Sequence, residues 1–418
     1  MSPPGTVSTQ SPSQASPTFE KASIGRQPIF NARAEVVGYE LLYRSSNENA
    51  AAFTDGDQAT SDVLVNAFIN VGLEELVGKH PAFVNLTRDF LMSEALLPDA
   101  PGKIVLEVLE DIVPDDALID RLTALSQRGF TIALDDFVRH SNLTPLLTLA
   151  DIVKVDLPGI AADQLADQVE ELKCFPLRLL AEKVETHAQY DLCKELGFEL
   201  FQGCFLARPE IVQGRKIGDN RLVAIRVLAK LSDPQVDLGE LESIIAADAA
   251  MAYKFLRFVN SAHFGLARKV SSIKHALALL GLSGVRNVVA LLTLAGMAQT
   301  KPLELLRMAF IRAQMAVELA QSAKHENPSA YFMAGLFSLL DAILDQPLDE
   351  ILRHLPLEDW VLRGIEQRTG SIGDVLNCVE AYEQGDFDRA RLESIGVDAV
   401  GTAYWAAVKT AAALDEAT

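Results

Sequence analysis

Cysteine is scarce in this sequence, and the pattern of its cysteines fits neither metal binding nor a disulfide framework. The 418 residues include four cysteines, which are Cys174, Cys193, Cys204 and Cys378. None of them forms a CxxC pair, and no histidine stands at a metal-ligand distance from them in the sequence. We therefore expect reduced, partly buried thiols of the kind found in cytosolic proteins.

Basic residues are also in the minority. Lys and Arg total 37 against 57 Asp and Glu, which gives a net charge of -20, and no run of five or more basic residues offsets it. The negative electrostatic field of a chain with this charge repels phosphate backbones and anionic lipid. Direct nucleic-acid binding is therefore disfavoured.

Long apolar segments are missing as well. Residues 1–22 are rich in Ser, Pro and Thr and have no apolar core, so we expect a disordered tail and no signal peptide. Later apolar stretches such as "NVVALLTLAGMA" are too short to span a bilayer and lie among helical patterns. We expect no membrane segment and a cytoplasmic protein of two to three folded domains.

The first half of the chain alternates short apolar runs with helical segments. Six runs, each closed by a polar residue, are "AFVN", "KIVLE", "FTIALDD", "DIVKVD", "LRLLAE" and "FELFQ". Helical periodicity appears between most of them, and "GRQPIF" and "VVGYELLYR" add two strands in front. This alternation predicts a parallel sheet covered on both faces, and about eight strands favour a (β/α)8-type barrel over a doubly wound sheet.

Polar residues close the predicted strands. They are Glu40, Asn85, Glu107, Asp135, Asp136, Lys154, Glu182, Glu185 and Gln202. Barrel enzymes carry their chemistry at the carboxyl ends of the strands, so these side chains should converge on one rim. Oxygen ligands without histidine or thiolate suit Mg²⁺ or Mn²⁺. Taken singly, each residue also fits a solvated loop acid or a helix cap.

Two adjacent aspartates bear on the kind of metal site. Asp135 and Asp136 reach one site only if the strand is already turning there, because successive side chains of a regular strand face opposite ways. Two cations bridged in this way would activate water and neutralise the oxygens of a phosphodiester. Lys154 would either position that water and help to deprotonate it, or form a strand-end salt bridge.

Seven ordered motifs carry a family resemblance. "GYELLYR", "FVNLT", "LEVLE", "LDDF", "VKVD", "AEKVET" and "FQGCFLARP" resemble the successive motifs of the EAL domain over roughly residues 24–212, and we take 23–212 as the domain. The resemblance implies a (β/α)8-type barrel with a modified first strand. It also implies that active members hydrolyse cyclic di-GMP to the linear dinucleotide pGpG with Mg²⁺ or Mn²⁺.

The resemblance also assigns roles to matching positions. Ligands of a first metal would be Glu40, Asn85, Glu107 and Asp135. A second metal would be held by Asp135, Asp136 and Glu182. Catalytic roles fall to Lys154, Glu182 and Glu185, with Glu110 supporting the adjoining loop. Arg44, Leu42 and Gln202 would contact the substrate.

Three positions depart from the EAL pattern. Leu41 replaces the signature alanine, and Lys183 replaces a glycine. The loop "VRHSNLTPLL" after Asp136 contains no glycine, so Val138 and Arg139 cannot keep a shape that needs positive φ. These departures favour nucleotide binding or another regulatory role over turnover.

The second half of the chain has helical periodicity almost throughout. After a polar, glycine-bearing linker at 213–220, residues 221–418 predict an all-α domain. "KLSDP", "RFVNSAHFG", "SSIKHALALLG" and "MAGLFSLLDAIL" resemble an HDOD domain, which is related to metal-dependent HD phosphohydrolases. No histidine is followed by aspartate, and Ser338 and Leu339 stand where that dipeptide would be. We expect this half to be non-catalytic.

Two functions remain open from the sequence. In the favoured one, a divergent EAL barrel binds cyclic di-GMP or metal, or acts as a regulatory scaffold, and the HDOD domain transmits its state to a signalling partner protein. In the alternative, the barrel is an active Mg²⁺- or Mn²⁺-dependent cyclic di-GMP phosphodiesterase. The resemblance allows a homodimer in either case.

Overall fold

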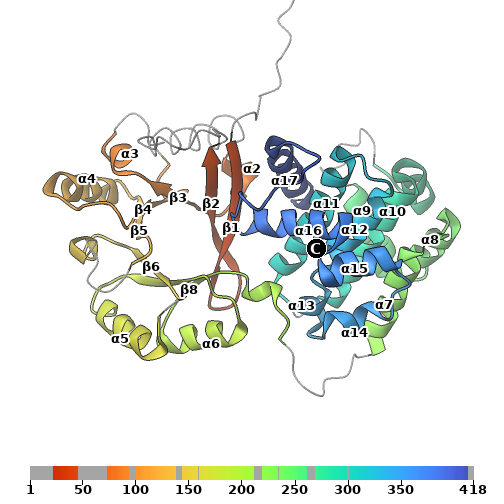
Figure 1. Ribbon diagram of the computed structural model, residues 1–418, viewed down its shortest axis with the longest axis horizontal. Coiled ribbons are helices and arrows are strands. Elements are labelled where there is room, and N and C mark those ends of the chain that lie inside the picture. Colours follow the sequence, from red (N-terminus) through yellow and green to blue (C-terminus); the bar gives the residue numbers. More distant parts are fainter. Residues whose placement is uncertain are drawn as a thin grey trace, which may run out of the picture.

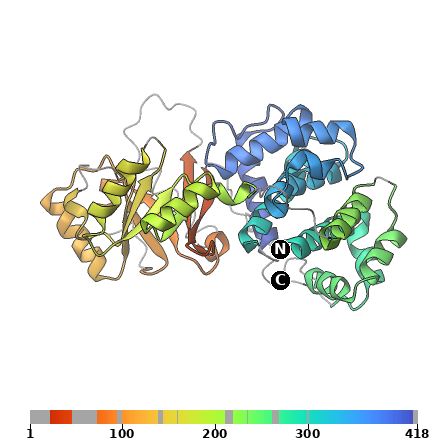
Figure 2. The ribbon, with the colours of Figure 1, turned by 90° about the horizontal axis from the view of Figure 1, so that it is seen from below.

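The chain forms two lobes, a β/α barrel followed by a helical domain (Figure 1). The computed structural model describes residues 22–45, 73–93, 100–137, 144–158, 160–210, 219–233, 235–260, 269–298 and 301–412. Viewed from below, the two lobes lie side by side (Figure 2). Residues 1–21 of the predicted tail, most of the predicted linker and most of the glycine-free loop fall outside the described residues, and Ala22, the last residue of that tail, begins a strand.

The predicted eight-stranded barrel is confirmed, and its strands close in chain order. The strands are β1 (Ala22–Asn31), β2 (Val36–Ser45), β3 (Ala82–Leu86), β4 (Ile104–Val108), β5 (Thr131–Leu134), β6 (Ile152–Asp156), β7 (Arg178–Glu182) and β8 (Leu200–Gln202). All neighbouring pairs from β2 to β8 are parallel.

The first strand runs the other way, as the resemblance implies. β1 is antiparallel to both β2 and β8. Only residues 32–35 separate β1 from β2, and so short a connection makes a hairpin because a parallel pair needs a long crossover. The two long strands of this hairpin face the helical domain (Figure 1).

Helices cover the outside of the barrel. They are α2 (Leu73–Val77), α3 (Arg88–Met92), α4 (Asp116–Gln127), α5 (Ala162–Leu172) and α6 (His187–Leu196), with short 3-10 turns η2 (Thr144–Leu146) and η3 (Phe205–Ala207). Local sequence explains α6 well. A capping box of Thr186 and Gln189 starts it, and Gly197 ends it at φ 103°, a conformation that glycine adopts without steric cost.

The second lobe is all-α in its described part, as predicted. Its helices are α7 (Asp219–Ser232), α8 (Leu238–Ala246), α9 (Ala249–Val259), α10 (Ile273–Met297), α11 (Leu303–Ser322), α12 (Pro328–Phe337), α13 (Leu340–Leu344), α14 (Leu348–Leu352), α15 (Asp359–Gln367), α16 (Gly370–Glu383) and α17 (Val397–Ala411). α7 begins inside the predicted linker, and the domain limits 23–212 and 221–418 stay predictions.

One helix of this lobe is long and apolar enough to cross a bilayer. Among the described helices α10 alone meets that test, which concerns length and composition, and 50% of its most apolar window is buried in the structure. Gly281 interrupts it at φ 66° and ψ 179°. α10 packs against α7, α8 and α9 within the lobe.

The helical lobe contacts the hairpin of the barrel directly. The Tyr382 hydroxyl on α16 donates to the Ile24 carbonyl at 2.9 Å. On β2, the Tyr39 hydroxyl donates to Glu304 Oε2 of α11 at 3.2 Å. The strand that carries the EAL signature therefore also contacts the helical lobe.

Candidate functional site

The barrel interior has an apolar layer beneath a polar one. Seven buried residues fill the lower layer: Ile29, Phe83, Val105, Ala133, Ile152, Leu180 and Leu200. On six strands, the residue two positions further on is a predicted site residue, namely Asn85, Glu107, Asp135, Lys154, Glu182 and Gln202. Residues i and i+2 of a strand share a face, so these side chains lie together above the apolar layer at the carboxyl end of the barrel.

Lys154 stands at the centre of this polar layer. Its side chain is 1% exposed. Its Nζ lies 2.7 Å from Asp135 Oδ1, 2.8 Å from Glu107 Oε1 and 3.0 Å from Glu182 Oε1. Glu40 Oε2 is 3.5 Å away. One ammonium group thus contacts four carboxylates.

Protonation in this cluster follows from burial and charge. Burial alone would lower the pKa of Lys154, but the carboxylates, with Glu107 first, raise that pKa well above its usual value. Burial raises the pKa of the fully buried Glu107, with Lys154 opposing the shift. Burial likewise raises the pKa of Glu182 to about 8, opposed by Lys154 and assisted by Asp135. A single cation cannot neutralise four buried carboxylates, so the metal-free cluster retains protons near neutral pH.

The turn after β5 brings both aspartates to one place. Asp136 has φ 40°, so the chain leaves the strand conformation directly after Asp135. Backbone bonds fix the turn on both sides: Asp135 N–H donates to the Val108 carbonyl, and Phe137 N–H donates to the Lys154 carbonyl, each at 3.0 Å. Carboxylate oxygens of Asp135, Asp136 and Glu182 lie within 4.8 Å of one another. Burial and the neighbouring Asp135 raise the pKa of Asp136.

These donors fit a hard divalent cation. Buried oxygen atoms without a hydrogen-bond partner include Glu107 Oε2, Glu182 Oε2 and Asn85 Oδ1. Unpaired buried oxygens are costly unless something satisfies them. The set is made of carboxylate and amide oxygens, which suit Mg²⁺ or Mn²⁺.

Amide side chains orient the signature glutamate. Asn85 Nδ2 donates to Glu40 Oε1 at 3.1 Å, and Gln202 Nε2 donates to Glu40 Oε2 at 2.5 Å. Gln202 Nε2 also donates to Gln27 Oε1 at 2.8 Å. Sequence reasoning missed Gln27, although the antiparallel register pairs it directly with Glu40.

Other predicted residues lie at the rim, away from Lys154. Glu110 and Glu185 are exposed, and Glu185 follows β7 just before the N-cap of α6. Lys183 adopts φ 54° in place of the family glycine, and its Nζ contacts Asp156 Oδ2 at 2.7 Å. Asp156, at the end of β6, was also missed. The same strand-end reasoning that found the other acids applies to it.

Of the other signature residues, Leu41 is buried in the hydrophobic core and Leu42 lies against the helical lobe. Leu41 is 3% exposed and belongs to the main hydrophobic core outside the barrel interior. The Cδ1 atom of Leu42 lies 2.6 Å from where a Cβ on Gly385 would stand. Arg44 pairs with Ser23 in the hairpin, and its side chain is outside the described residues. The proposed substrate contacts of Leu42 and Arg44 stay predictions.

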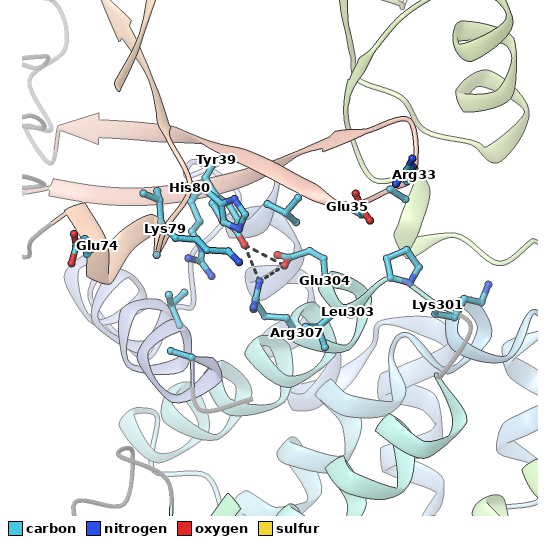
Figure 3. A pocket seen from close by; sticks show the side chains of 18 residues that line it. Arg33, Glu35, Tyr39, Glu74, Lys79, His80, Lys301, Leu303, Glu304 and Arg307 are labelled. Atoms are coloured by element: carbon cyan, nitrogen blue, oxygen red, sulfur yellow. Dashed lines mark hydrogen bonds and ion pairs between the residues drawn. The ribbon is translucent and has the colours of Figure 1, made fainter. Parts of the chain in front are cut away.

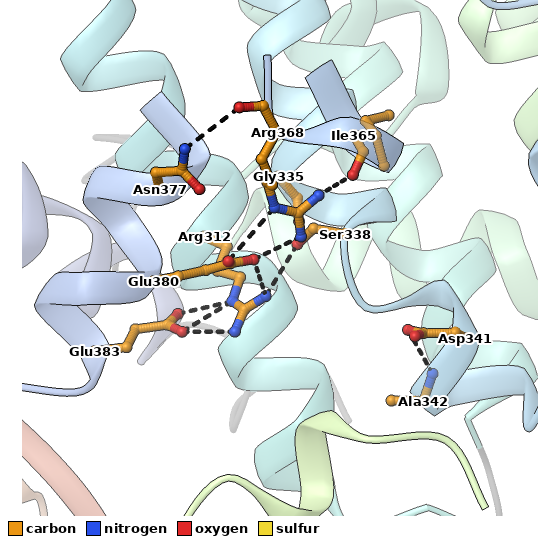
Figure 4. A network of polar contacts seen from close by, with 10 residues as sticks. All are labelled: Arg312, Gly335, Ser338, Asp341, Ala342, Ile365, Arg368, Asn377, Glu380 and Glu383. Carbon is orange, nitrogen blue, oxygen red and sulfur yellow. Dashed lines mark hydrogen bonds and ion pairs between the residues drawn. The ribbon is translucent and has the colours of Figure 1, made fainter. Parts of the chain in front are cut away.

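A network of ion pairs surrounds a buried arginine of the helical lobe (Figure 4). Arg312 on α11 contacts Glu383 at 2.8 Å and Glu380 at 3.1 Å. Its Nη1 also donates to Ser338 Oγ at 3.3 Å. Ser338 is the residue at the position of the missing HD dipeptide, so in this chain the region around it is occupied by ion pairs.

Comparison with known proteins gives two domain matches and two long relatives. Residues 48–209 match the EAL domain and residues 221–344 match the HDOD domain. The chain is 34% identical over 373 residues to the uncharacterized protein YuxH of Bacillus subtilis, covering 87% of this chain and 91% of that protein. It is 33% identical over 374 residues to the cyclic di-GMP phosphodiesterase CdgJ of Vibrio cholerae, covering 88% and 87%.

A solved structure is also similar to part of this chain. The phosphodiesterase PaMucR in complex with c-di-GMP, from Pseudomonas aeruginosa, is 26% identical and aligns with a TM-score of 0.38. The alignment covers 48% of this chain and 99% of that chain.

Proposed function

Because this chain belongs to the family of proteins that join an EAL domain to an HDOD domain, we propose that its barrel is a metal-dependent cyclic di-GMP phosphodiesterase in a signalling protein. The observation that carries the proposal is the contact of Lys154 with four carboxylates beside the Asp135, Asp136 and Glu182 group. Linear pGpG would be the product.

Each residue has a distinct task in this proposal. Glu40, Asn85, Glu107 and Asp135 would hold one cation, and Asp136 and Glu182 would share Asp135 in holding a second. Bound Mg²⁺ or Mn²⁺ would supply an activated water and charge neutralisation at the phosphodiester. Lys154 keeps its proton at neutral pH, so its task is to orient that water and to balance the carboxylates rather than to act as a base.

Gln202 and Asn85 keep Glu40 in one orientation through their amide hydrogen bonds. This orientation matters because metal ligands that are themselves hydrogen-bonded hold the ion in a defined position. Glu185 and Glu110 are exposed at the rim. They would support the adjoining loop and the metal shell.

A second candidate function is cyclic di-GMP binding without turnover. The sequence from Val138 to Leu147 contains no glycine, and Lys183 occupies a positive-φ position next to Glu182. A side chain in that conformation is strained relative to glycine. In this case the barrel would act as a sensor or scaffold for the helical lobe.

The helical lobe is proposed to be a non-catalytic transmitter. Its contact with β2 through Tyr39 and Glu304 gives it a route to the barrel site. We propose a protein partner for this lobe and a cytoplasmic location.

The experiment measures product formation by the full chain. Purified protein is incubated with cyclic di-GMP and Mn²⁺, and the products are separated by chromatography. Glu40→Gln and Glu182→Gln should abolish turnover, whereas Glu195→Gln, on the exposed face of α6, should not. If no product forms, calorimetry with cyclic di-GMP separates the two candidates: binding supports the sensor, and no binding rejects both.

A further inference from the structure

A cavity of about 850 Å³ lies between the two lobes (Figure 3), and no residue of the carboxylate cluster lines it. Its walls come from the β1–β2 turn, the segment after α2, the start of α11 and the end of α17. This volume is in the range of sites that hold molecules of nucleotide size.

Cationic side chains dominate the charged part of its lining. They are Arg26, Arg33, Lys79, Lys301 and Arg307, against the acids Glu35, Glu74 and Glu304. In a chain of net charge -20, five cations facing three acids around one cavity is a local reversal of sign.

The acids of the cavity already have partners. Glu304 Oε2 contacts Arg307 at 2.6 Å and accepts from the Tyr39 hydroxyl. Glu74 contacts Lys103 at 2.9 Å, and Glu35 accepts from Asn31 Nδ2 at 2.8 Å. Two of these partners, Lys103 and Asn31, are not part of the lining.

Three of the cations have no carboxylate partner in the part of the chain that the structure describes. Arg33 and Lys79 are exposed and form no ion pair there. Arg26 donates to the main-chain carbonyl of Leu76 and lies over the Tyr39 ring, 4.4 Å from its centroid. Their positive charge remains available to an anion.

Much of the remaining wall is apolar. Val36, Val77, Leu303 and Val408 line the cavity alongside these cations. A ligand with an organic body and several negative charges fits such a surface better than a bare inorganic ion does. Guanidinium and ammonium groups together favour phosphate groups, which accept several charge-assisted hydrogen bonds at once.

We propose that this cavity binds a phosphate-bearing small molecule of nucleotide size, held by Arg33, Lys79 and Arg26. The site is separate from the metal cluster. It borders Tyr39, the residue before Glu40 in the signature strand, so its occupant contacts the barrel and the helical lobe at the same time.

The test is calorimetry on the full chain in buffer without divalent metal and without cyclic di-GMP. GTP is the probe, inorganic pyrophosphate reports the contribution of the phosphates, and guanosine reports that of the uncharged body. GTP should bind, pyrophosphate should bind more weakly, and guanosine should give no measurable heat. Added salt should weaken GTP binding, since screening reduces attraction between charges that face solvent.

Variants locate the site. Arg33→Gln with Lys79→Gln removes two exposed cations and should weaken GTP binding by about tenfold or more, because charge-assisted hydrogen bonds to phosphate are lost. Arg33→Lys with Lys79→Arg should restore it. The matched control, Lys173→Gln with Lys194→Gln, removes the same charge from exposed sites paired with Glu170 and Asp191 and should change affinity by less than about twofold.

Two results would overturn the proposal. One is the absence of binding heat with both GTP and pyrophosphate. The other is equal GTP affinity in the native chain and the Arg33→Gln, Lys79→Gln variant, which would assign binding to another site. Neither result bears on turnover at the carboxylate cluster, because the measurement contains no metal and no cyclic di-GMP.

Discussion

Replacing Lys154 with methionine tests the charge balance of the barrel site. The change keeps the length and apolar stem of the side chain and removes the one cation that contacts Glu107, Asp135, Glu182 and Glu40. Without metal, the four carboxylates are then left without a counter-charge. We expect a loss of stability that depends strongly on pH.

The size of the expected loss of stability follows from the distances between Lys154 and its carboxylates. At 2.7 Å and an effective dielectric near 20, the attraction between Lys154 and Asp135 is about 6 kcal/mol before desolvation. Carboxylates limit the loss by taking up protons, and protonating an ordinary carboxylate costs about 1.4 kcal/mol per pH unit above its pKa. We therefore expect Lys154→Met to lower the free energy of unfolding by about 3–5 kcal/mol at pH 8 and by about 1–2 kcal/mol near pH 5.5.

The direction of this pH dependence follows from the raised pKa of Glu182 in the native cluster. The pKa of Glu182 is raised to about 8 from 4.5. Its stabilising contribution is therefore complete below pH 4.5 and is lost as the pH rises through 8. Removing Lys154 raises such pKa values further, so the stability difference between the variant and the native chain widens with pH.

Lys183→Met is the matched control at the same rim. Its Nζ contacts Asp156, but its side chain is 58% exposed. Solvent screening limits the contribution of such an ion pair to stability to about 1 kcal/mol or less. Comparing the two lysines separates a buried charge network from an exposed ion pair.

Urea unfolding without divalent metal measures both variants. Both tryptophans, Trp360 and Trp405, lie in the helical lobe, so their fluorescence follows that lobe while far-ultraviolet circular dichroism follows the whole chain. The loss for Lys154→Met should appear in dichroism before it appears in fluorescence. If Lys154→Met lowers the free energy of unfolding at pH 8 no more than Lys183→Met does, Lys154 does not balance the buried carboxylates.

Three further predictions concern the helical lobe, the contact between the lobes and metal binding. Arg312→Leu should destabilise the helical lobe by about 3–5 kcal/mol, because it leaves Glu383 buried without its cation; an unchanged fluorescence midpoint in urea would contradict this. Tyr39→Phe removes the hydroxyl that accepts from Arg307 at 3.0 Å, so amide exchange at the start of α11 should accelerate, and unaltered exchange would argue against the contact. Mn²⁺ affinity should rise between pH 6 and 8 by up to about tenfold per unit, since the proton on Glu182 must leave; affinity measured by calorimetry and found independent of pH would rule this out.

Much of the barrel site is readable from the sequence because its geometry is set by strand periodicity. The pairs Val105 with Glu107 and Ile152 with Lys154 show the rule: an inward apolar residue is followed two positions later by an inward polar one. Strand ends of a parallel barrel meet at one rim. Local pattern and fold class together are therefore enough to predict most of the cluster.

Other features depend on backbone conformation or on contacts distant in sequence. Asp136 lies beside Asp135 at the site because its φ is positive. The sequence indicates only that a turn is possible at this position. Tyr39 and Glu304 are 265 positions apart. No local pattern indicates that the signature strand would face α11, so neither this contact nor the cavity beside it was predictable.

The product that the full chain forms from cyclic di-GMP with Mn²⁺ decides whether the carboxylate cluster is catalytic. We expect linear pGpG from the native chain and none from Glu182→Gln at equal protein concentration. Cyclic di-GMP that binds but remains intact with the metal-loaded native chain would contradict catalysis and assign the barrel to sensing.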